Sequence, residues 1–417
     1  MIEFEFYDFK GRVFMFIFKK IVCRAYQIAF RAVLPVLPYR EPKIMPRCED
    51  IADVLIFEKA ASVLVVTDVG IVKNKLLLPV EDALKKSKVN YVIYDKTQPN
   101  PTVANVEEAL DIYHQNKCDA LIAIGGGSSI DCAKAIGARV AYAKRSLDKL
   151  GGKLKVWRRI PTLIAIPTTA GTGSETTVAA VITDAQTHHK YVINDFCLIP
   201  HYALLDAQVT VGLPKHLTST TGMDALTHAV EAYIGKSRTK ATKLAAEKAV
   251  KLIFENLELA YQNGGDIQAR KNMLYASYLA GTAFTKSYVG YVHAVAHTLG
   301  GKYGVPHGLA NAILLPKVLR AYKDGATKPL AQLAKAVGLV PSDTPTAQAA
   351  EAIIAHIEGM NERMQIPTSF DCINKDDIPA MAKLADKEAN PLYPVPVLWD
   401  AKQLQQIYHL VCAEQNN

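Results

Sequence analysis

Residues 120–131 have the sequence ALIAIGGGSSID, in which five apolar residues run directly into three glycines and a polar segment. An apolar run of this length predicts a buried strand, and Ser128 can cap a helix after the glycines. Glycines here let backbone N–H groups approach an anion, and a helix N-terminus adds positive potential. The stretch therefore predicts a diphosphate cradle, although a tight turn alone would also explain the glycines.

Three further apolar runs of the same kind lie at residues 62–66, 91–94 and 162–166, and amphipathic segments separate them. This alternation predicts an α/β domain with a parallel sheet over residues 42–212. The last run leads into a loop rich in Thr and Gly, which suits the rim of a nucleotide site. Asp68 ends the first run, where an acid can bind a ribose or cap a helix. The GxGxxG fingerprint of many dinucleotide sites is absent.

After residue 212 the strand-like runs stop, and Ala, Leu, Lys and Glu recur at helical spacing. We therefore expect three parts: a basic amphipathic arm (1–41), an α/β dinucleotide-binding domain (42–212) and an all-helical metal and catalytic domain (213–417). A cleft between the two domains would bring a nucleotide and a metal together.

Two segments of the helical part carry candidate metal ligands. His293 and His297 are four residues apart in an apolar segment, and His307 follows after a Gly-Gly break. Asp224 and His228 are also four apart, so each pair leaves one face of its helix. Any one of these histidines could be an ordinary core residue, but one carboxylate and several imidazoles together suit a divalent transition ion with an open position.

The net charge of +8 comes from one segment, because residues 10–47 hold nine Lys or Arg against the single acid Glu41. The rest of the chain is neutral overall. A nucleic-acid-binding protein would need a broad basic surface, so we expect a small-molecule substrate and no nucleic-acid partner.

Residues 13–37 are hydrophobic, but cations interrupt them well short of the ~18 residues that a membrane span needs. They are not a cleavable signal either. On a helix, Lys20, Arg24, Gln27 and Arg31 share one face. This basic amphipathic helix could lie on an anionic membrane surface, contact a neighbouring subunit or pack on its own protein.

The chain has seven cysteines without a CxxC pair, which indicates reduced thiols in the cytoplasm. They are Cys23, Cys48, Cys118, Cys132, Cys197, Cys372 and Cys412. The length of 417 residues suffices for two domains, and a homo-oligomer, most simply a dimer, is the default expectation.

Four motifs in this order resemble the iron-containing, group III alcohol dehydrogenases. They are GGGSSID (125–131), PTTAGTGSETT (167–177), GMDALTHAVEAY (222–233) and HAVAHTLGGKYGVPHG (293–308), and the resemblance extends over roughly residues 55–415. It implies a nucleotide-binding α/β domain, a helical metal domain and NAD(P)-dependent interconversion of alcohols or diols with aldehydes or ketones.

Residue by residue, the resemblance implies that Asp224, His228, His293 and His307 bind Fe²⁺, or zinc as in some relatives, with His297 as a catalytic residue beside the substrate. It also implies dinucleotide contacts, which are Asp68, Asn100, Gly126, Gly127, Ser128, Thr168, Thr169, Thr172 and Lys190. A carboxylate at Asp68 would repel the 2′-phosphate of NADP, so we expect NAD. The chain departs from the family in the arm and at Lys286, where relatives often have Asn. Phe284 either lines the substrate pocket or packs in the core.

The expected chemistry is polarisation of the alcohol oxygen by the ion, with hydride passing to the nicotinamide. His297 would relay the alcohol proton. Two alternatives stay open at this point. One is a metal-dependent lyase with a fold like that of dehydroquinate synthase, and the other is a non-catalytic module that docks through the basic helix.

Overall fold

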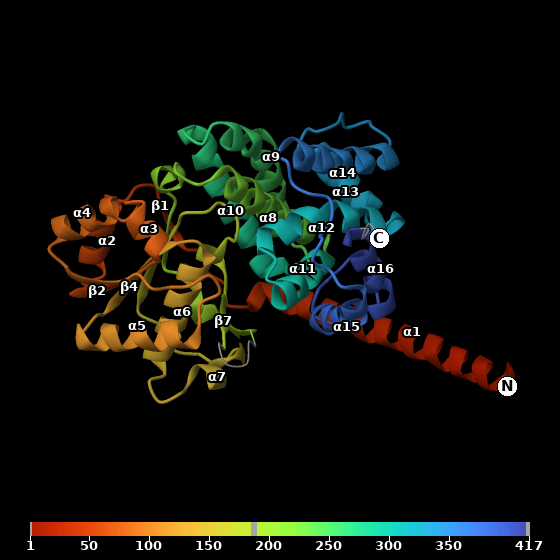
Figure 1. The fold of residues 1–417 in the computed structure, drawn as a ribbon, viewed down its shortest axis with the longest axis horizontal. Coiled ribbons are helices and arrows are strands. Elements are labelled where there is room, and N and C mark those ends of the chain that lie inside the picture. The colour runs from red at the N-terminus through yellow and green to blue at the C-terminus, as the bar shows by residue number, and fades with distance from the viewer. Residues whose placement is uncertain (1, 185–189, 414–417) are drawn as a thin grey trace. The chain divides into compact units, whose positions relative to one another are not determined.

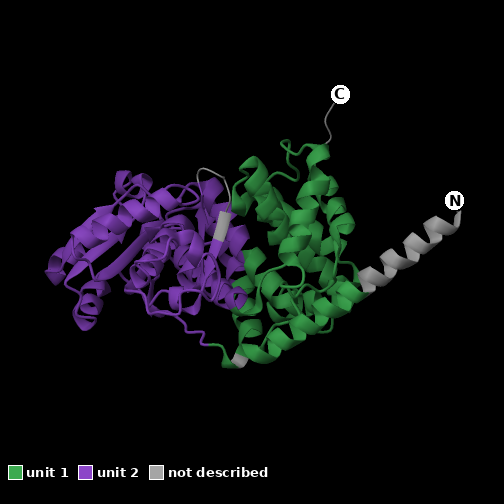
Figure 2. Cartoon of the chain, turned by 90° about the horizontal axis from the view of Figure 1, so that it is seen from below, with its two compact units in different colours: residues 1–37, 226–251, 286–417 green, residues 38–225, 252–285 purple. Residues whose placement is uncertain are grey.

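The computed structural model describes residues 2–184 and 190–413, with side chains from Phe18 onward except those of Pro35, Lys190 and Tyr191. The chain forms two compact units (Figure 2). The sheet unit comprises Pro38–Ala225 and Leu252–Thr285, and the helical unit comprises Met1–Leu37, Leu226–Lys251 and Lys286–Asn417. The domain ranges drawn from the sequence differ from this division and stay a prediction.

The sheet unit is built on six parallel strands in the order β1-β9-β6-β4-β2-β3. The strands are β1 (Lys43–Met45), β2 (Ser62–Val66), β3 (Asn90–Tyr94), β4 (Ala120–Gly125), β6 (Thr162–Pro167) and β9 (Tyr202–Leu204). β2, β4 and β6 are near-continuous apolar runs because helices cover both faces of a parallel sheet. The predicted parallel α/β fold is confirmed.

The side chains of β2 alternate between two cores on opposite faces of this sheet. Leu64 and Val66 pack in a cluster with residues of α5 (Val103–Gln115) and α6 (Gly127–Ala141), including Val106. Val63 and Val65 pack in another cluster, with residues of α2 (Asp50–Phe57) and α4 (Leu78–Ser87). Figure 1 shows α2 and α4 on one side of the strands and α5 and α6 on the other. This period of two fixes the strand register and the helix layers together.

The helices around the sheet are α2 (Asp50–Phe57), α3 (Val69–Lys73), α4 (Leu78–Ser87), α5 (Val103–Gln115), α6 (Gly127–Ala141) and α7 (Leu147–Leu150). A second, three-stranded sheet has the order β5-β8-β7 and comprises β5 (Gly152–Lys153), β7 (Ala179–Thr183) and β8 (Lys190–Asn194). The glycine loop follows β4 and the threonine loop follows β6, and these two strands are direct neighbours in the six-stranded sheet.

After β9, the described residues form helices and no further strand. The helices are α8 (Lys215–Ile234), α9 (Lys240–Gln262), α10 (Ile267–Ser287), α11 (Tyr291–Tyr303), α12 (His307–Ala321), α13 (Asp324–Ala336), α14 (Thr346–Arg363), α15 (Ile378–Ala389) and α16 (Ala401–Val411). The predicted all-helical second part is therefore confirmed.

The N-terminal helix α1 (Ile2–Val33) packs against its own unit through polar side chains. Gln27 is only 4% exposed and its amide nitrogen donates to the Tyr393 carbonyl at 2.8 Å. The Lys19 ammonium lies 2.7 Å from the Asp386 carboxylate. Ile28 on α1 is 70% exposed. In the described part of this helix, Lys19 and Gln27 thus face the protein, whereas apolar side chains such as Ile28 face outward, unlike the arrangement in an ordinary amphipathic helix.

No helix in the described part of the chain is long and apolar enough to cross a membrane. This agrees with the interrupted hydrophobic pattern of residues 13–37.

Close packing of α10 on the threonine loop generates a stability prediction. A Cβ at Gly281 would lie 2.9 Å from the backbone oxygen of Gly173 and closer still to Thr176. We expect Gly281→Ala to lower the free energy of unfolding by about 1–3 kcal/mol. Gly301, also in a helix, has nothing within 4 Å of such a Cβ. Gly301→Ala should therefore be neutral or slightly stabilising in the same urea titration. Equal effects of both variants would contradict the packing argument.

Candidate active site

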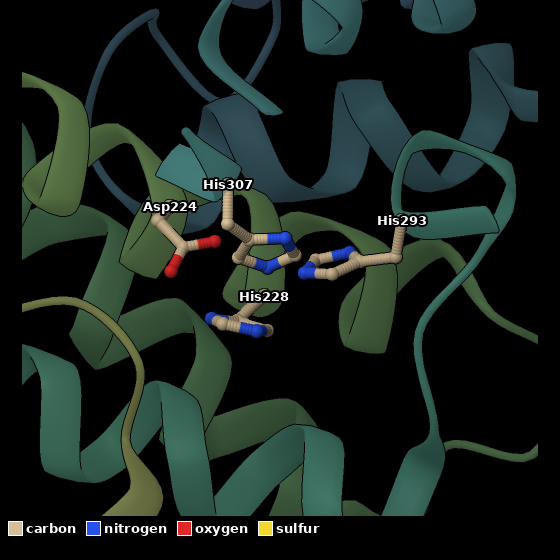
Figure 3. A group of neighbouring side chains, drawn as sticks. All are labelled: Asp224, His228, His293 and His307. Carbon is tan, nitrogen blue, oxygen red and sulfur yellow. The ribbon is translucent and has the colours of Figure 1, made fainter. Parts of the chain in front are cut away.

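Four predicted ligands come together in one buried cluster (Figure 3). Asp224, His228, His293 and His307 each offer a ligand atom, and these atoms all lie within 4.8 Å of one another. Asp224 and His228 leave one face of α8, one turn apart. His293 comes from the first turn of α11, and His307 is the first residue of α12. The first three are buried and His307 is half-buried.

A buried carboxylate, Glu231, orients His293. It lies in α8 and accepts hydrogen bonds from the backbone N–H of Gly290 at 2.7 Å and of Val292 at 2.8 Å. Its other close contact is the Nδ1 of His293 at 2.6 Å. With that nitrogen donating to the carboxylate, the Nε2 lone pair of His293 is left to bind a metal. The sequence reasoning missed Glu231, although an acid three residues after His228 in an apolar helix was a signal.

Asn311 lies where the ring nitrogens of two ligands converge. Its amide nitrogen is 3.2 Å from the Nε2 of His293 and 3.1 Å from the Nε2 of His307. The residue is fully buried in α12, four residues after His307. The convergence shows that both imidazoles point toward a common position. Asn311 was also missed from the sequence.

Burial sets the protonation of the cluster. It lowers the pKa of His293 well below the usual value, and the neighbouring imidazoles of His228 and His307 lower it further. The ring is therefore neutral at physiological pH, as metal ligation requires. Burial also raises the pKa of Glu231 to about 7, against the opposing effect of its hydrogen-bond donors.

The residues present fit a divalent transition ion. Three imidazole nitrogens and one carboxylate oxygen form a donor set that suits Fe²⁺ or Zn²⁺. A protein-only set of four leaves room for a further ligand such as a substrate oxygen on an ion that expands its coordination. None of the four is a cysteine, so the set differs from a thiolate-rich structural zinc site.

His297 lies beside this cluster without belonging to it. Its ring stacks on that of His307 with 5.3 Å between centroids, and its side chain is 43% exposed. Its Nδ1 lies 2.6 Å from a carboxylate oxygen of Glu388, which also accepts a hydrogen bond from the Tyr393 hydroxyl at 2.7 Å. Burial disfavours the Glu388 charge, but the nearby His297 and these hydrogen bonds outweigh it and lower the pKa of Glu388.

The predicted dinucleotide residues of the glycine and threonine loops lie together at the carboxyl ends of β4 and β6. A Cβ at Gly126 would lie 3.7 Å from the Thr169 hydroxyl, and one at Gly127 would lie 3.0 Å from Thr172. The backbone N–H of Asn100 donates to the Ser128 hydroxyl at 3.3 Å.

Thr168 joins this group through the backbone of the two adjacent strands. Its N–H donates to the Gly125 carbonyl at 2.9 Å. Gly125 has a φ of 151°, and a Cβ there would lie 2.4 Å from the Ser129 hydroxyl, so only glycine fits this turn.

Asp68 occupies the end of β2 and serves as a helix cap. Its Oδ1 accepts the backbone N–H of Gly70 at 2.8 Å and of Ile71 at 3.2 Å. Its Oδ2 would lie 3.3 Å from a Cβ at Gly125, so the second oxygen faces the glycine turn. Capping and ribose binding can thus use different oxygens of one carboxylate. Lys190 begins β8, and its side chain lies outside the described residues.

Lys134, which the sequence reasoning also missed, ties the threonine loop to α6. It is fully buried, and its ammonium donates to the Thr177 hydroxyl at 2.7 Å, the Ala179 carbonyl at 2.9 Å and the Ser174 hydroxyl at 3.1 Å. Burial lowers the pKa of Lys134 to about 8. The same Ser174 hydroxyl donates a hydrogen bond of 2.6 Å to the carboxylate of Asp131, which lies one turn earlier in α6.

The two halves of the chain match two family models. The model for iron-containing alcohol dehydrogenase matches residues 47–207, and the model for the C-terminal part of the Fe-containing alcohol dehydrogenase family matches residues 218–412. The chain belongs to the iron-containing alcohol dehydrogenase family. As a member of this family it is an oxidoreductase, so the predicted family and enzyme class are confirmed. The lyase and the non-catalytic docking module are not favoured.

Individual relatives agree with this family. The chain is 39% identical to the 1,3-propanediol dehydrogenase of Klebsiella pneumoniae, over 78% of this chain and 85% of that protein. It is 40% identical to the NAD-dependent methanol dehydrogenase of Bacillus methanolicus, over 78% and 86%. The solved structure of the alcohol dehydrogenase from Oenococcus oeni superposes with a TM-score of 0.85 at 33% identity. The superposition covers 89% of this chain and 100% of that structure.

The ligand cluster of this alcohol dehydrogenase generates a prediction on metal content. Asp224 is its only anionic ligand candidate, so Asp224→Ala should remove most of the metal from the purified protein. Glu231→Gln should weaken metal affinity about 10–100-fold through the His293 ring. Asp111→Ala, which removes an exposed carboxylate of α5, is the control and should retain metal. Metal content is measured by elemental analysis. Full retention in Asp224→Ala would contradict the assignment.

Proposed function

We propose that this alcohol dehydrogenase interconverts a small primary alcohol or diol and its aldehyde with NAD, at an Fe²⁺ ion held by Asp224, His228, His293 and His307. The convergence of one carboxylate oxygen and three imidazole nitrogens carries the proposal. The names of the relatives, a 1,3-propanediol dehydrogenase and an NAD-dependent methanol dehydrogenase, support a short substrate and NAD. Zn²⁺ suits the same donors.

Each bound group supplies one part of the chemistry. The ion, when bound, acts as a Lewis acid on the alcohol oxygen. The nicotinamide, when bound, accepts the hydride. The chain itself must orient the ligands and move the alcohol proton. Glu231 performs the first task for His293. The backbone N–H groups of Gly290 and Val292 fix its carboxylate, and the carboxylate in turn holds the His293 ring.

His297 is proposed as the catalytic residue that moves the proton. Its neutral ring can accept a proton next to the ligand cluster, and the Glu388 carboxylate 2.6 Å away stabilises the resulting imidazolium. Because the side chain of His297 is partly exposed, the proton can continue to solvent. Glu388 acts through His297 and is a positioning residue.

The proposed dinucleotide contacts are those implied by the resemblance: Asp68, Asn100, Gly126, Gly127, Ser128, Thr168, Thr169, Thr172 and Lys190. The close packing of the two loops at the start of α6 supports a diphosphate there, because backbone N–H groups at a long helix N-terminus attract anions. The second oxygen of Asp68, which faces the glycine turn and does not cap the helix, supports ribose binding.

The proposal includes a cytoplasmic location and a homo-oligomer, most simply a dimer. Seven cysteines without a disulfide among the described residues support a reducing compartment. A subunit or peripheral membrane contact through residues 13–37 also belongs to the proposal.

A turnover screen tests the substrate and cofactor. The iron-loaded enzyme should reduce NAD⁺ with C2 to C6 alcohols and diols, and should use NADP⁺ less efficiently because the Asp68 charge repels a 2′-phosphate. Asp68→Asn keeps the helix cap but removes the charge, so the NADP⁺ to NAD⁺ ratio of kcat/KM should rise about tenfold. An enzyme that prefers NADP⁺ from the start would exclude this role for Asp68. Absence of turnover in the metal-loaded protein would overturn the proposed function.

A second test concerns His297. His297→Ala should lower kcat about 10²–10⁴-fold and leave the metal bound, because a general base is lost and no ligand is removed. Glu388→Gln should give a smaller loss and shift the pH profile. His409→Ala, an exposed imidazole on α16, is the matched control and should keep full activity. Loss of metal from His297→Ala would make this residue a ligand instead.

A further inference from the structure

The helical unit has a pocket of about 760 Å³ whose charged lining residues are all cations. These are Arg24, Arg31, Lys236, Arg238, Lys240 and Lys243. The pocket lies between α1 and the segment that joins α8 to α9. A pocket of the sheet unit at the end of α6 shows the usual mixture, since Glu107 and Asp148 line it beside basic residues. A uniformly positive pocket attracts a multivalent anion.

The positive charge is only partly neutralised from within the protein. Lys243 lies 3.7 Å from Glu247, and the guanidinium of Arg238 donates to a backbone carbonyl. Lys236 and Lys240 are exposed and have no acidic partner among the described residues. Partial burial lowers the pKa of Lys236, and repulsion from the neighbouring Arg24 lowers it further.

The first turn of α9 adds to this potential. The helix runs over Lys240–Gln262, so the positive end of a long helix dipole lies at the pocket. Among the N–H groups of this first turn, the Thr239 hydroxyl accepts only that of Thr242, at 3.2 Å. Phosphate groups combine the charge and the acceptor oxygens that arginine, lysine and helix N-termini recognise.

An apolar groove of about 570 Å³ adjoins the basic pocket, and both share Arg24, Ile28 and Pro396 as lining residues. Ile21 and Leu398 complete its apolar walls. Ile21 and Ile28 are 62% and 70% exposed, because α1 turns its polar stripe toward the protein. A ligand that occupies both sites needs a phosphate-bearing head and a hydrocarbon chain.

We propose that this composite site binds an anionic phospholipid, with the phosphate head group in the basic pocket and an acyl chain in the groove. The exposed apolar side chains of α1 then insert at the acyl boundary, as in other interfacial helices. The site would hold the dehydrogenase on an anionic membrane surface. This inference does not depend on the proposed substrate or cofactor.

Vesicle flotation of the full-length enzyme tests the proposal. Vesicles that contain phosphatidic acid should carry the protein, and pure phosphatidylcholine vesicles should not. The double variant Lys236→Glu/Lys240→Glu should bind the anionic vesicles at least about tenfold more weakly. Lys85→Glu/Lys86→Glu on α4 makes the same charge change at exposed lysines elsewhere and should bind as the parent does. Equal losses in both variants, or no loss in the first, would overturn the proposal.

Calorimetry separates a lipid from a free phosphate. Short-chain dihexanoyl phosphatidic acid should bind more tightly than inorganic pyrophosphate, because its chains use the groove. Ile21→Ser changes a residue that lines the groove and not the basic pocket, so it should weaken the lipid and leave pyrophosphate unchanged. Pyrophosphate binding as tight as that of the lipid, without vesicle binding, would make the site a pocket for small anions and contradict the lipid assignment. Circular dichroism of each variant confirms that it is folded.

Discussion

One buried carboxylate determines how the metal ligands are arranged. Glu231 on α8 receives the first backbone N–H groups of α11 and the ring of His293. A buried carboxylate that lost these donors would cost several kcal/mol, so α11 must begin where it does. Gly290 is required at that point because a Cβ there would lie 2.6 Å from the Glu231 oxygen. Helix packing and ligand orientation are therefore one interaction.

In the sheet unit, a buried positive charge fixes the position of a loop, as the buried negative charge of Glu231 fixes the start of α11. Lys134 is buried beneath the threonine loop and donates to Ser174, Thr177 and Ala179. An unsatisfied ammonium would be as costly as an unsatisfied carboxylate. The loop after β6 is thus fixed against α6, and the polar rim beside the glycine turn has little freedom to change shape. Each candidate site is thus supported by one buried charged group, Glu231 behind His293 and Lys134 behind the threonine loop.

Local patterns in the sequence predicted the parts of these sites that depend on spacing. The four-residue step from Asp224 to His228 and the apolar runs before the glycine and threonine loops needed only helix and strand geometry. Glu231 and His293 are 62 residues apart, and their pairing is set by how α8 and α11 pack. Glu388 meets His297 across 91 residues for the same reason. An acid in an apolar helix marks Glu231 as unusual, but contacts between distant segments leave no periodic signal. The pairings of Glu231 with His293 and of Glu388 with His297 could therefore not be predicted.

The inverted orientation of α1 follows from the proline-rich segment of residues 391–396. Prolines lack the N–H group that pairs a neighbouring strand or helix, so carbonyl groups of this segment need donors from elsewhere. Gln27 and Arg24 supply them, donating to the carbonyls of Tyr393 and Val395 at 2.8 and 2.7 Å. Two members of the polar stripe, Arg24 and Gln27, are therefore used inside the protein. Apolar side chains such as Ile28 then face outward and line a groove beside the basic pocket. An anionic phospholipid matches both, because its hydrocarbon chain suits the groove and its phosphate suits the pocket.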